Sequence, residues 1–396
     1  MFKRVARRLS RTSSDLEGHA PRDMNKSVMT NKRHLVIAAS SETFDSGVIQ
    51  RWIDEGFDVH YEQVHGDSRS STFAVEAHGD DLESGDKYAI IAYDEAASVL
   101  LNRAFQARGK LCAIVAFYPA TLPDPGSVPP EDLHVQVHLA GDQPFAPKYP
   151  NFNYEGTRPG FDEPHCDAYN RIASGLAWSR ALDCIRRGFG IVVDLEGIWE
   201  RHLARRIPSH QRPLLLLTDT KSTDEFVTHD SVATIGTMTP NPSVVHIPTL
   251  TGGVGQRELH RFYDEFFIPS IPASMRTTLL SRTVGSDKII DEMLISFTHT
   301  QEIPWLLPGV PPTDKYIEIV LVSVVKIIGG KLESERLHWD QASVLVQAGL
   351  LDARLGAVGL GEGGIRRLPI VGAEAPRIAF EGNDGSVALN ELMPGW

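Results

Sequence analysis

Two kinds of strand pattern divide this 396-residue chain, and the change between them limits the folds it can adopt. In the first half, short runs that are almost wholly apolar, such as YAIIAY (88–93) and LCAIVAFYP (111–119), alternate with segments of helical spacing. Strands that are apolar on both sides are typical of a parallel sheet covered by helices on both faces. In the second half, long strands follow one another directly, with GSD (285–287) and GG (329–330) as the turns between them. We therefore expect an α/β domain followed by an α+β domain.

These changes of pattern divide the chain into four regions. Residues 1–33 are expected to be a disordered basic N-terminus, 34–190 an α/β domain, 194–352 an α+β domain and 353–396 an irregular tail. In the first domain we expect strands at 35–40, 57–64, 88–93, 111–119 and 133–141. In the second we expect short helices at 194–206, 230–238 and 255–267, then strands at 276–284, 288–300, 315–328 and 331–339, and a helix at 340–351.

Composition narrows the classes of partner. Asp and Glu number 51 against 39 Lys and Arg, which gives a net charge of −12 and argues against binding to a phosphate backbone. Three cysteines cannot form a disulfide framework, which favours a reducing compartment, and no apolar run is long enough to span a bilayer. The acid-free start MFKRVARRLSRTSS resembles a mitochondrial presequence. We expect a cytoplasmic protein, with the mitochondrion as the alternative.

The turn after the third strand of the first domain has the residues of a nucleophile elbow. Small residues are needed two before and two after the nucleophile, and Ala92-Tyr93-Asp94-Glu95-Ala96 meets this requirement with Asp94 at the nucleophile position. The segments AIVAFYPA, HLAGDQPFAP and GFDEPHCDAYNRIASGLAWSRAL follow in order. Together they resemble the dienelactone hydrolase branch of the α/β-hydrolases over roughly residues 34–190, which implies an α/β-hydrolase-like fold.

The same resemblance implies a catalytic triad that this chain has lost. The family's nucleophilic cysteine matches Asp94, its histidine matches Pro159, and its acid is nearest to Asp142. Proline cannot act as a base, so the three positions form a degenerate hydrolase site. Two alternatives stay open. One is a carboxymethylenebutenolidase-like hydrolase that acts through Asp94 with His165 as a substitute base; the other is a relic in which Asp94 caps its helix.

The second domain carries motifs of another family. LEGIWERH, VVHIPTLTGGVG, FYDEFFIPSIP and LHWDQASVLVQAGLLD follow in order, and they resemble the SnoaL-like polyketide cyclase branch of the nuclear-transport-factor-2-like superfamily. The whole chain resembles fungal proteins that fuse the two kinds of domain. The resemblance implies an α+β cone around a deep apolar pocket. It also implies cofactor-free proton transfer by an acid and a histidine, for cyclisation or isomerisation of a polyketide-like substrate.

Strand periodicity selects candidate catalytic residues in the cone. Alternate residues share a face, which groups 291, 293, 295, 297 and 299 on one strand and 336, 338 and 340 on the last strand. Asp340, with Gln347 seven residues later, matches the family's catalytic aspartate, and we expect it inside the cone. The predicted catalytic residues are Asp340, His338 and His299. The predicted substrate-binding residues are His246, Arg282, Phe297, Trp305 and Trp339.

Each of these residues also has a structural interpretation. Asp340 opens a helix and could be its N-cap, the histidines could be hydrogen-bonded core residues, and Asp291 could form an ion pair with Arg282 across the hairpin. No metal site is expected, because His134 and His138 would lie about 13 Å apart on a strand. Residues 203–222 interrupt the family pattern, as an inserted loop or as wrongly translated intron sequence.

Three classes of function remain open. The first is a cofactor-free enzyme that acts on a small hydrophobic molecule in the second domain. The second is a hydrolase that acts at Asp94. The third is a non-catalytic ligand-binding or dimerisation protein. We expect no cofactor, no nucleic acid and no membrane partner, and we leave a homodimer open.

Overall fold

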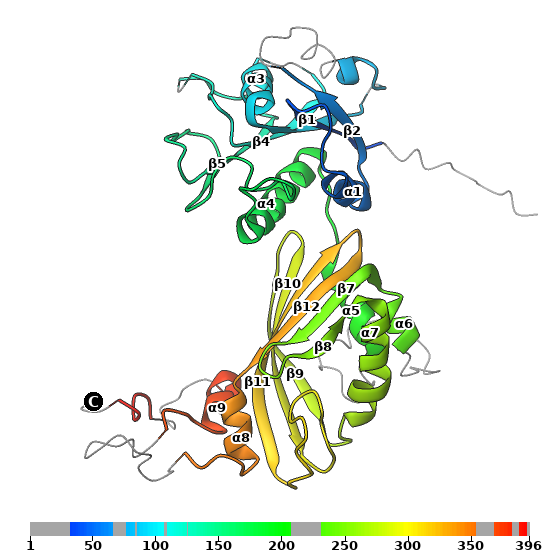
Figure 1. Cartoon of the computed structure of the whole chain (residues 1–396), viewed down its shortest axis with the longest axis vertical. Helices are drawn as coiled ribbons and strands as arrows, with labels where there is room; N and C mark the ends of the chain where they lie inside the picture. Colours follow the sequence, from blue (N-terminus) through cyan, green and yellow to red (C-terminus); the bar gives the residue numbers. More distant parts are fainter. Residues whose placement is uncertain are drawn as a thin grey trace, which may run out of the picture. The chain divides into compact units, whose positions relative to one another are not determined.

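Two six-stranded sheets form the framework of the protein, one in each predicted domain (Figure 1). The computed structural model describes residues 32–65, 77–83, 85–106, 109–124, 126–206, 231–353, 368–381 and 388–393. Disorder was predicted for residues 1–33, of which residues 1–31 lie outside the described part of the chain. Among the described residues, no helix combines the length and the apolar character needed to cross a bilayer.

The first sheet is entirely parallel, as its apolar runs predict, with the strand order β2-β1-β3-β4-β5-β6. Its strands are β1 (His34–Ala39), β2 (Asp58–Gln63), β3 (Tyr88–Tyr93), β4 (Leu111–Phe117), β5 (His134–Ala140) and β6 (Asn151–Tyr154). β6 falls outside the predicted strands because its sequence, NFNY, is short and half polar. The order of strand addition reverses between β1 and β3, and ligands of such sheets usually bind beyond the carboxyl ends at this point.

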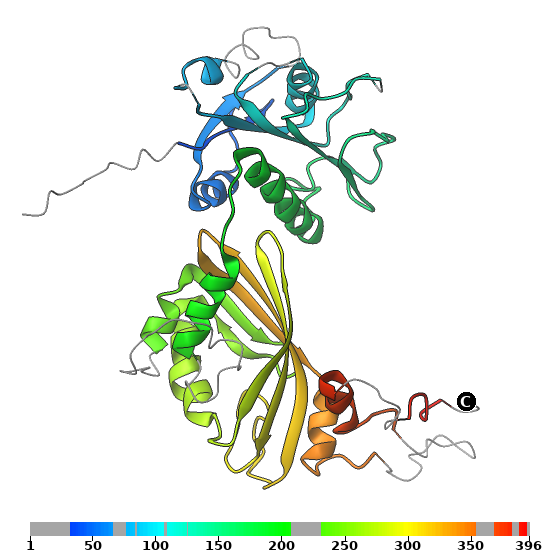
Figure 2. The same ribbon diagram turned by 180° about the vertical axis from the view of Figure 1, so that it is seen from behind.

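Helices cover both faces of the first sheet (Figure 2). They are α1 (Ser46–Asp54), α3 (Asp94–Ala104) and α4 (Arg171–Phe189). α1 and α4 pack on one face through Trp52 and Trp178, whose ring centroids lie 4.5 Å apart, whereas α3 packs on the other face. Asn170 caps α4 by accepting hydrogen bonds from two backbone N–H groups, and Gly190 ends the helix at a φ of 68°. The central strands β1, β3 and β4 are therefore buried on both sides, which explains their apolar sequences.

The second sheet is curved and mainly antiparallel, with the order β8-β7-β12-β11-β10-β9. Its strands are β7 (Met238–His246), β8 (Thr251–Val254), β9 (Arg276–Val284), β10 (Lys288–Thr298), β11 (Tyr316–Ile328) and β12 (Lys331–Trp339). The last four correspond to the predicted strands. β7 and β8 are additions, and β7 runs parallel to β12. The prolines Pro240 and Pro242 conceal β7 in the sequence, because proline within a run argues against a strand.

Helices lie against the concave face of the second sheet and complete an α+β cone (Figures 1 and 2). They are α5 (Leu195–Arg206), α6 (Ser231–Ile235) and α7 (Gly255–Arg261), which continues into a π-helical stretch (Phe262–Phe267) and a short turn (Ile268–Ser270). Trp199 of α5, Tyr263 of the π-helical stretch and Phe297, next to the last residue of β10, are fully buried in the shared core. The architecture expected for residues 194–352 is thus present.

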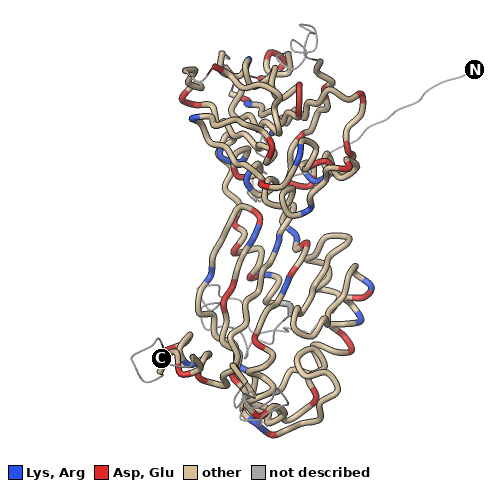
Figure 3. The backbone as a smooth tube through the Cα atoms, turned by 60° about the vertical axis from the view of Figure 1, so that its left-hand side comes forward, with Lys and Arg blue, Asp and Glu red and all other residues tan. Residues whose placement is uncertain are grey.

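The helices at the C-terminal end differ from the prediction, and most of the suspected insertion lies outside the described residues. α8 (Gln341–Gln347) is shorter than predicted, and the tail, expected to be irregular, contains α9 (Glu374–Glu381); both helices contact β11. Of the suspected insertion at 203–222, residues 203–206 continue α5, and the remainder lies outside the described residues. Lys and Arg are interspersed with Asp and Glu along the described chain (Figure 3).

Candidate functional site

The cone holds an apolar pocket with a volume of about 60 Å³, or about 570 Å³ when the space open to solvent at its mouth is counted. Strands β7, β10, β11 and β12 supply one wall, and α5 and the π-helical stretch supply the other. The lining residues are Trp199, Leu203, His246, Phe267, Ile271, Met275, Thr277, Met293, Ile295, Trp305, Leu321, Glu335 and Leu337.

Glu335 brings an acid into this apolar pocket. It lies on the inner face of β12, where its side chain is buried, and the Ser323 hydroxyl on β11 donates a 2.9 Å hydrogen bond to its Oε1 atom. This bond holds the carboxyl group in one orientation. Glu335 was not among the predicted site residues, although Leu337, two residues later on the same face of β12, marks that face as the inner one.

His246 brings the second ionisable group, and it is fully buried at the end of β7. The Thr251 hydroxyl donates to the carbonyl oxygen of Trp305 at 3.1 Å and lies 3.0 Å from Nδ1 of His246. The Thr249 hydroxyl donates to the same carbonyl oxygen at 2.8 Å. These contacts fix the orientation of the His246 ring.

Aromatic rings surround His246 on several sides. Its ring centroid lies 5.4 Å from that of Trp305, 5.5 Å from that of Phe262, 5.8 Å from that of Trp339 and 6.2 Å from that of Phe267. His246 is therefore packed among aromatic side chains. Aromatic faces at about 6 Å attract a cation.

Glu335 and His246 come from adjacent strands. The register pairs Glu335 with Val244 and Leu337 with His246, so the two ionisable residues are diagonal neighbours on the concave face. Among the described lining residues, they are the two with ionisable side chains. The pocket can therefore hold an apolar molecule next to one acid and one imidazole.

The predicted catalytic site around Asp340 is not assembled in the structure. Asp340 is exposed, not enclosed by the cone, and it is the N-cap of α8: its carboxylate accepts from the Ala342 N–H at 3.0 Å and from the Ser343 hydroxyl at 2.7 Å. His338 is exposed on the same outer face. The prediction placed the wrong face of β12 inside, because the inner face carries Glu335 and Leu337.

The predicted inner face of β10 is correct, but its residues have different roles. Met293 and Ile295 line the pocket, whereas Phe297 is a core residue outside the lining. His299 is fully buried beyond the end of the strand and hydrogen-bonds Thr313, with 3.1 Å between Nδ1 and Oγ1; burial lowers its pKa below the usual value. It lies outside the lining and corresponds to the structural interpretation of a core histidine.

Arg282 belongs to a buried ion pair instead of the pocket lining. Its Nε and Nη2 atoms donate to both oxygens of Asp291 at 2.7 and 2.9 Å, and Trp199 Nε1 donates to Oδ2 of the same carboxylate at 2.7 Å. Glu196 accepts a further bond from Arg282. This network joins β9 and β10 to α5, which agrees with the cross-strand ion pair considered above.

The other predicted binding residues lie at or near the pocket. Trp305 and His246 are in the lining. Trp339 stands behind them: its ring contacts both of theirs, and its Nε1 donates to Gln341 at 2.6 Å.

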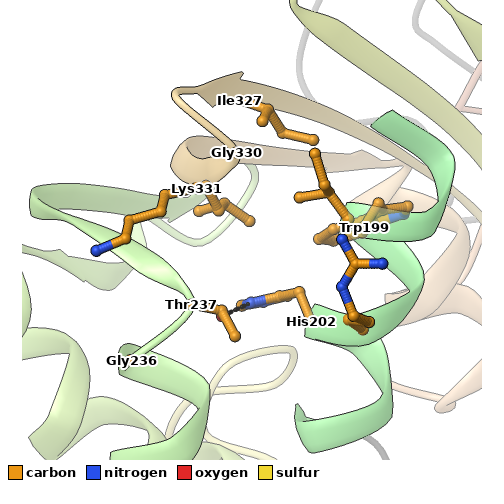
Figure 4. Close-up of a pocket in the computed structure, with 10 residues that line it drawn as sticks. Trp199, His202, Gly236, Thr237, Ile327, Gly330 and Lys331 are labelled. Atoms are coloured by element: carbon orange, nitrogen blue, oxygen red, sulfur yellow. Dashed lines mark hydrogen bonds between the residues drawn. The ribbon is translucent and has the colours of Figure 1, made fainter. Parts of the chain in front are cut away.

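A second pocket, of about 550 Å³, lies on another side of Trp199 (Figure 4). His202 and Thr237 lie next to each other in its lining, joined by a 2.6 Å hydrogen bond. Arg201 and Lys331 also line it, which makes it more polar than the first pocket. It contains no acid among its described lining residues, so it offers no acid–histidine pair.

In the first domain, Asp94 stands at the strained turn expected of an elbow. β3 ends at Tyr93 and α3 begins at Asp94, whose φ is 51°. Positive φ is costly for residues other than glycine and is often found at functional sites. Asp94 does not cap its helix, because the N-cap residue is Tyr93 and no side chain accepts a bond there.

The remaining members of the degenerate hydrolase site do not provide a base. Asp142 and Pro159 are exposed. His165, the suggested substitute base, has a side chain that is 88% exposed and pairs with Asp45 at 2.8 Å. No described histidine is hydrogen-bonded to Asp94.

A buried acid lies beyond the same carboxyl ends of the sheet. Asp162 is buried, and burial raises its pKa to about 7; Tyr93 donates a 3.4 Å hydrogen bond to it. The neighbouring Glu163 accepts from Tyr118 at 2.5 Å, and Tyr118 has a φ of 36°. Carboxylates and tyrosines therefore gather where a doubly wound sheet usually binds its ligand.

Comparisons with known proteins give low-identity neighbours. No family model matches the chain, and no curated protein matches it. Among solved structures, it is similar to a protein from Jannaschia sp. CCS1 described as a SnoaL-like polyketide cyclase (16% identity, 31% of this chain and 80% of that chain, TM-score 0.27). It is also similar to a protein with a ketosteroid isomerase-like fold from Catenulispora acidiphila DSM 44928 (12% identity, 41% and 96%, TM-score 0.26). An NTF2-like protein from Burkholderia pseudomallei K96243 is a third (17% identity, 30% and 85%, TM-score 0.24). The architecture of the second domain is defined by its own strand order, register and packing.

Proposed function

We propose that the second domain is a cofactor-free small-molecule enzyme of SnoaL-like type, in which Glu335 and His246 move protons on a hydrophobic, oxygenated substrate. One observation carries the proposal: an apolar pocket whose described lining contains these two titratable groups on adjacent strands. Acid–base groups inside an apolar pocket act with little competition from water.

The roles follow from the contacts of each group. The Glu335 carboxylate, oriented by Ser323, takes a proton from a substrate carbon next to a carbonyl group. His246, protonated at Nε2 and stabilised by the surrounding rings, donates a proton to the carbonyl oxygen as charge develops there. Thr251, 3.0 Å from Nδ1 of His246, holds the imidazole ring in place during this transfer. The step gives an enol. Return of the proton from Glu335 to another carbon, with the enol proton going back to His246, gives an isomerised ketone; attack of the enol carbon on a second carbonyl, whose oxygen is then protonated, gives a cyclised aldol.

Deuterium exchange tests the proposal without knowledge of the natural substrate. The full chain is incubated in D₂O with a panel of cyclic and polycarbonyl ketones, and loss of the α-proton signal is followed by NMR. We expect exchange of at least one ketone by the parent protein and its loss in Glu335→Gln. The matched control is Asp340→Asn, which makes the same acid-to-amide change on the outer face. Equal exchange by Glu335→Gln and parent would contradict the proposal.

The first domain supports a different proposal: a dienelactone hydrolase-like fold that has lost its chemistry. The strained Asp94 at the β3–α3 turn favours an elbow, while the exposed Pro159 and the Asp45-paired His165 leave it without a base. We expect no turnover of simple esters or lactones. Saturable esterase activity that disappears in Asp94→Ala would overturn this.

A further inference from the structure

Five ionisable side chains gather around one face of the edge strand β2. Asp58, His60 and Glu62 occupy alternate positions of this strand, so they share a face. His34, the first residue of β1, pairs directly with Asp58 in the parallel register. His78 joins them from a short helical turn at residues 77–80. The opposite face of β2 carries Val59 and Tyr61, which pack against the core beneath α1 and α4.

Three of these side chains converge on a small volume. His34 Nδ1 lies 3.4 Å from Oδ2 of Asp58, and His60 Nε2 lies 3.7 Å from Oδ1. One donor atom from each residue lies within 4.8 Å of the other two. Ligand atoms bound tetrahedrally at about 2.0–2.1 Å from a zinc ion are about 3.4 Å apart. Small side-chain rotations would bring all three atoms to that spacing.

We propose that His34, Asp58 and His60 bind one divalent transition-metal ion of the zinc type, with the fourth position left for water or an external ligand. Two imidazoles and one carboxylate form a ligand set that suits this ion. All three residues stand on two hydrogen-bonded strands, whose register fixes the separation of their backbones. Ligands on strands are held more precisely than ligands on loops.

The neighbouring pair extends the site. His78 Nε2 lies 3.0 Å from Oε1 of Glu62, and the rings of His78 and His60 are 5.1 Å apart. Side chains packed beside a metal ligand restrict its orientation and raise affinity. Glu62 and His78 are therefore assigned as positioning residues for His60, not as ligands.

Simple ion pairing explains the cluster less well than metal binding does. The rings of His34 and His60 stack at 6.1 Å beside one carboxylate, which cannot satisfy two imidazolium ions in full. A partly exposed histidine–carboxylate pair contributes little to stability. One metal ion can bind both imidazoles and the carboxylate at the same time.

Metal titration of the full chain tests the proposal. Protein freed of metal by chelation is titrated with Zn²⁺ by calorimetry and with Co²⁺ by visible absorption, which shows whether the ion is tetrahedral. We expect one specific site. Asp58→Asn and His60→Ala should each weaken binding by at least about tenfold, because loss of a ligand costs no less than loss of a supporting group. Zn²⁺ should raise the Tm of the parent and not that of these variants.

The matched control is His134→Ala. His134 is the first residue of β5, as His34 is of β1, and is also partly exposed, but it lies outside the cluster. We expect this variant to bind Zn²⁺ as the parent does. The absence of saturable binding by the parent would overturn the proposal, as would equal affinity in the parent and Asp58→Asn. Since asparagine keeps the size and shape of aspartate, that variant carries the test if His60→Ala does not fold.

Discussion

In the parallel sheet of the first domain, Asp94 and Asp162 lie beyond the carboxyl ends of the central strands, whereas in the cone Glu335 lies in mid-strand on the concave face, diagonal to His246 at the end of β7. The difference follows from burial. The central strands β1, β3 and β4 of the first sheet are covered on both faces and are almost wholly apolar, whereas the edge strand β2 carries polar side chains on one partly exposed face. The second sheet has one concave face, and Glu335 occupies it between apolar neighbours. A site at the carboxyl ends of the central strands therefore depends on loops, whereas the pocket of the cone and the cluster on β1 and β2 depend on strand register.

The largest effect is expected at the concave face. Glu335→Gln keeps the shape of the side chain but removes the titrating group, so proton transfer should fall by about two to four orders of magnitude. The rate of α-proton exchange of the best ketone gives the measurement. Asp340→Asn should leave that rate unchanged. A rate that falls in Asp340→Asn and not in Glu335→Gln would show that the active site lies on the outer face of β12.

The buried ion pair of the cone should dominate its stability. Asp291 is fully buried and accepts bonds from Arg282 and Trp199, so Asp291→Ala leaves a buried guanidinium without its main partner. The free energy of unfolding should fall by about 3–5 kcal/mol, as measured by urea denaturation. Glu292→Gln, on the other face of β10, should cost under about 1 kcal/mol. Similar losses in both variants would show that the inner position of Asp291 does not matter.

A pH dependence should distinguish the strand-end acid of the first domain. Burial raises the pKa of Asp162 from 3.8 to about 7, so the folded protein holds its proton more tightly than the unfolded chain does. This contribution to stability is full below about pH 4 and is lost as the pH rises to about 7. Asp162→Asn has no carboxyl group to ionise, so its stability should not fall in this way. The difference in stability between this variant and the parent should therefore change in favour of the variant by on the order of 2–4 kcal/mol between pH 4 and pH 8. Urea denaturation at both pH values measures it, with the exposed Asp142→Asn as a control that stays parallel to the parent.

The comparison also shows how far the sequence could predict the site. The parallel strands of the first domain and the four long strands of the second are visible as apolar runs, and the position of Asp94 follows from the end of one such run. Polar residues were harder to place. On β10 the apolar residues Met293 and Ile295 fix the inner face, and that prediction agrees with the structure. On the last strand the choice followed His338 and Asp340, and a shift of one residue turns every side chain to the other face.

Contacts between distant segments could not be predicted from local patterns. His246 lies on β7, whose two prolines conceal the strand, and its neighbour β12 is almost a hundred residues later in the chain. His34 and Asp58 belong to β1 and β2, and their pairing depends on the parallel register. The one local sequence signal of this cluster was the alternation of polar residues along β2, at positions 58, 60 and 62.

The smallest effect concerns Asp340 and completes the contrast between the two faces of β12. Its carboxylate accepts bonds from the Ala342 N–H and the Ser343 hydroxyl at the start of α8. Asp340→Ala removes this cap and should lower the free energy of unfolding by about 1 kcal/mol. Asp340→Asn should lower it by much less, because asparagine caps helices nearly as well as aspartate. Thermal denaturation of both variants, together with the exchange rate, separates the two roles. A cap loses stability with alanine alone and keeps its activity, whereas an acid catalyst would lose activity in both variants.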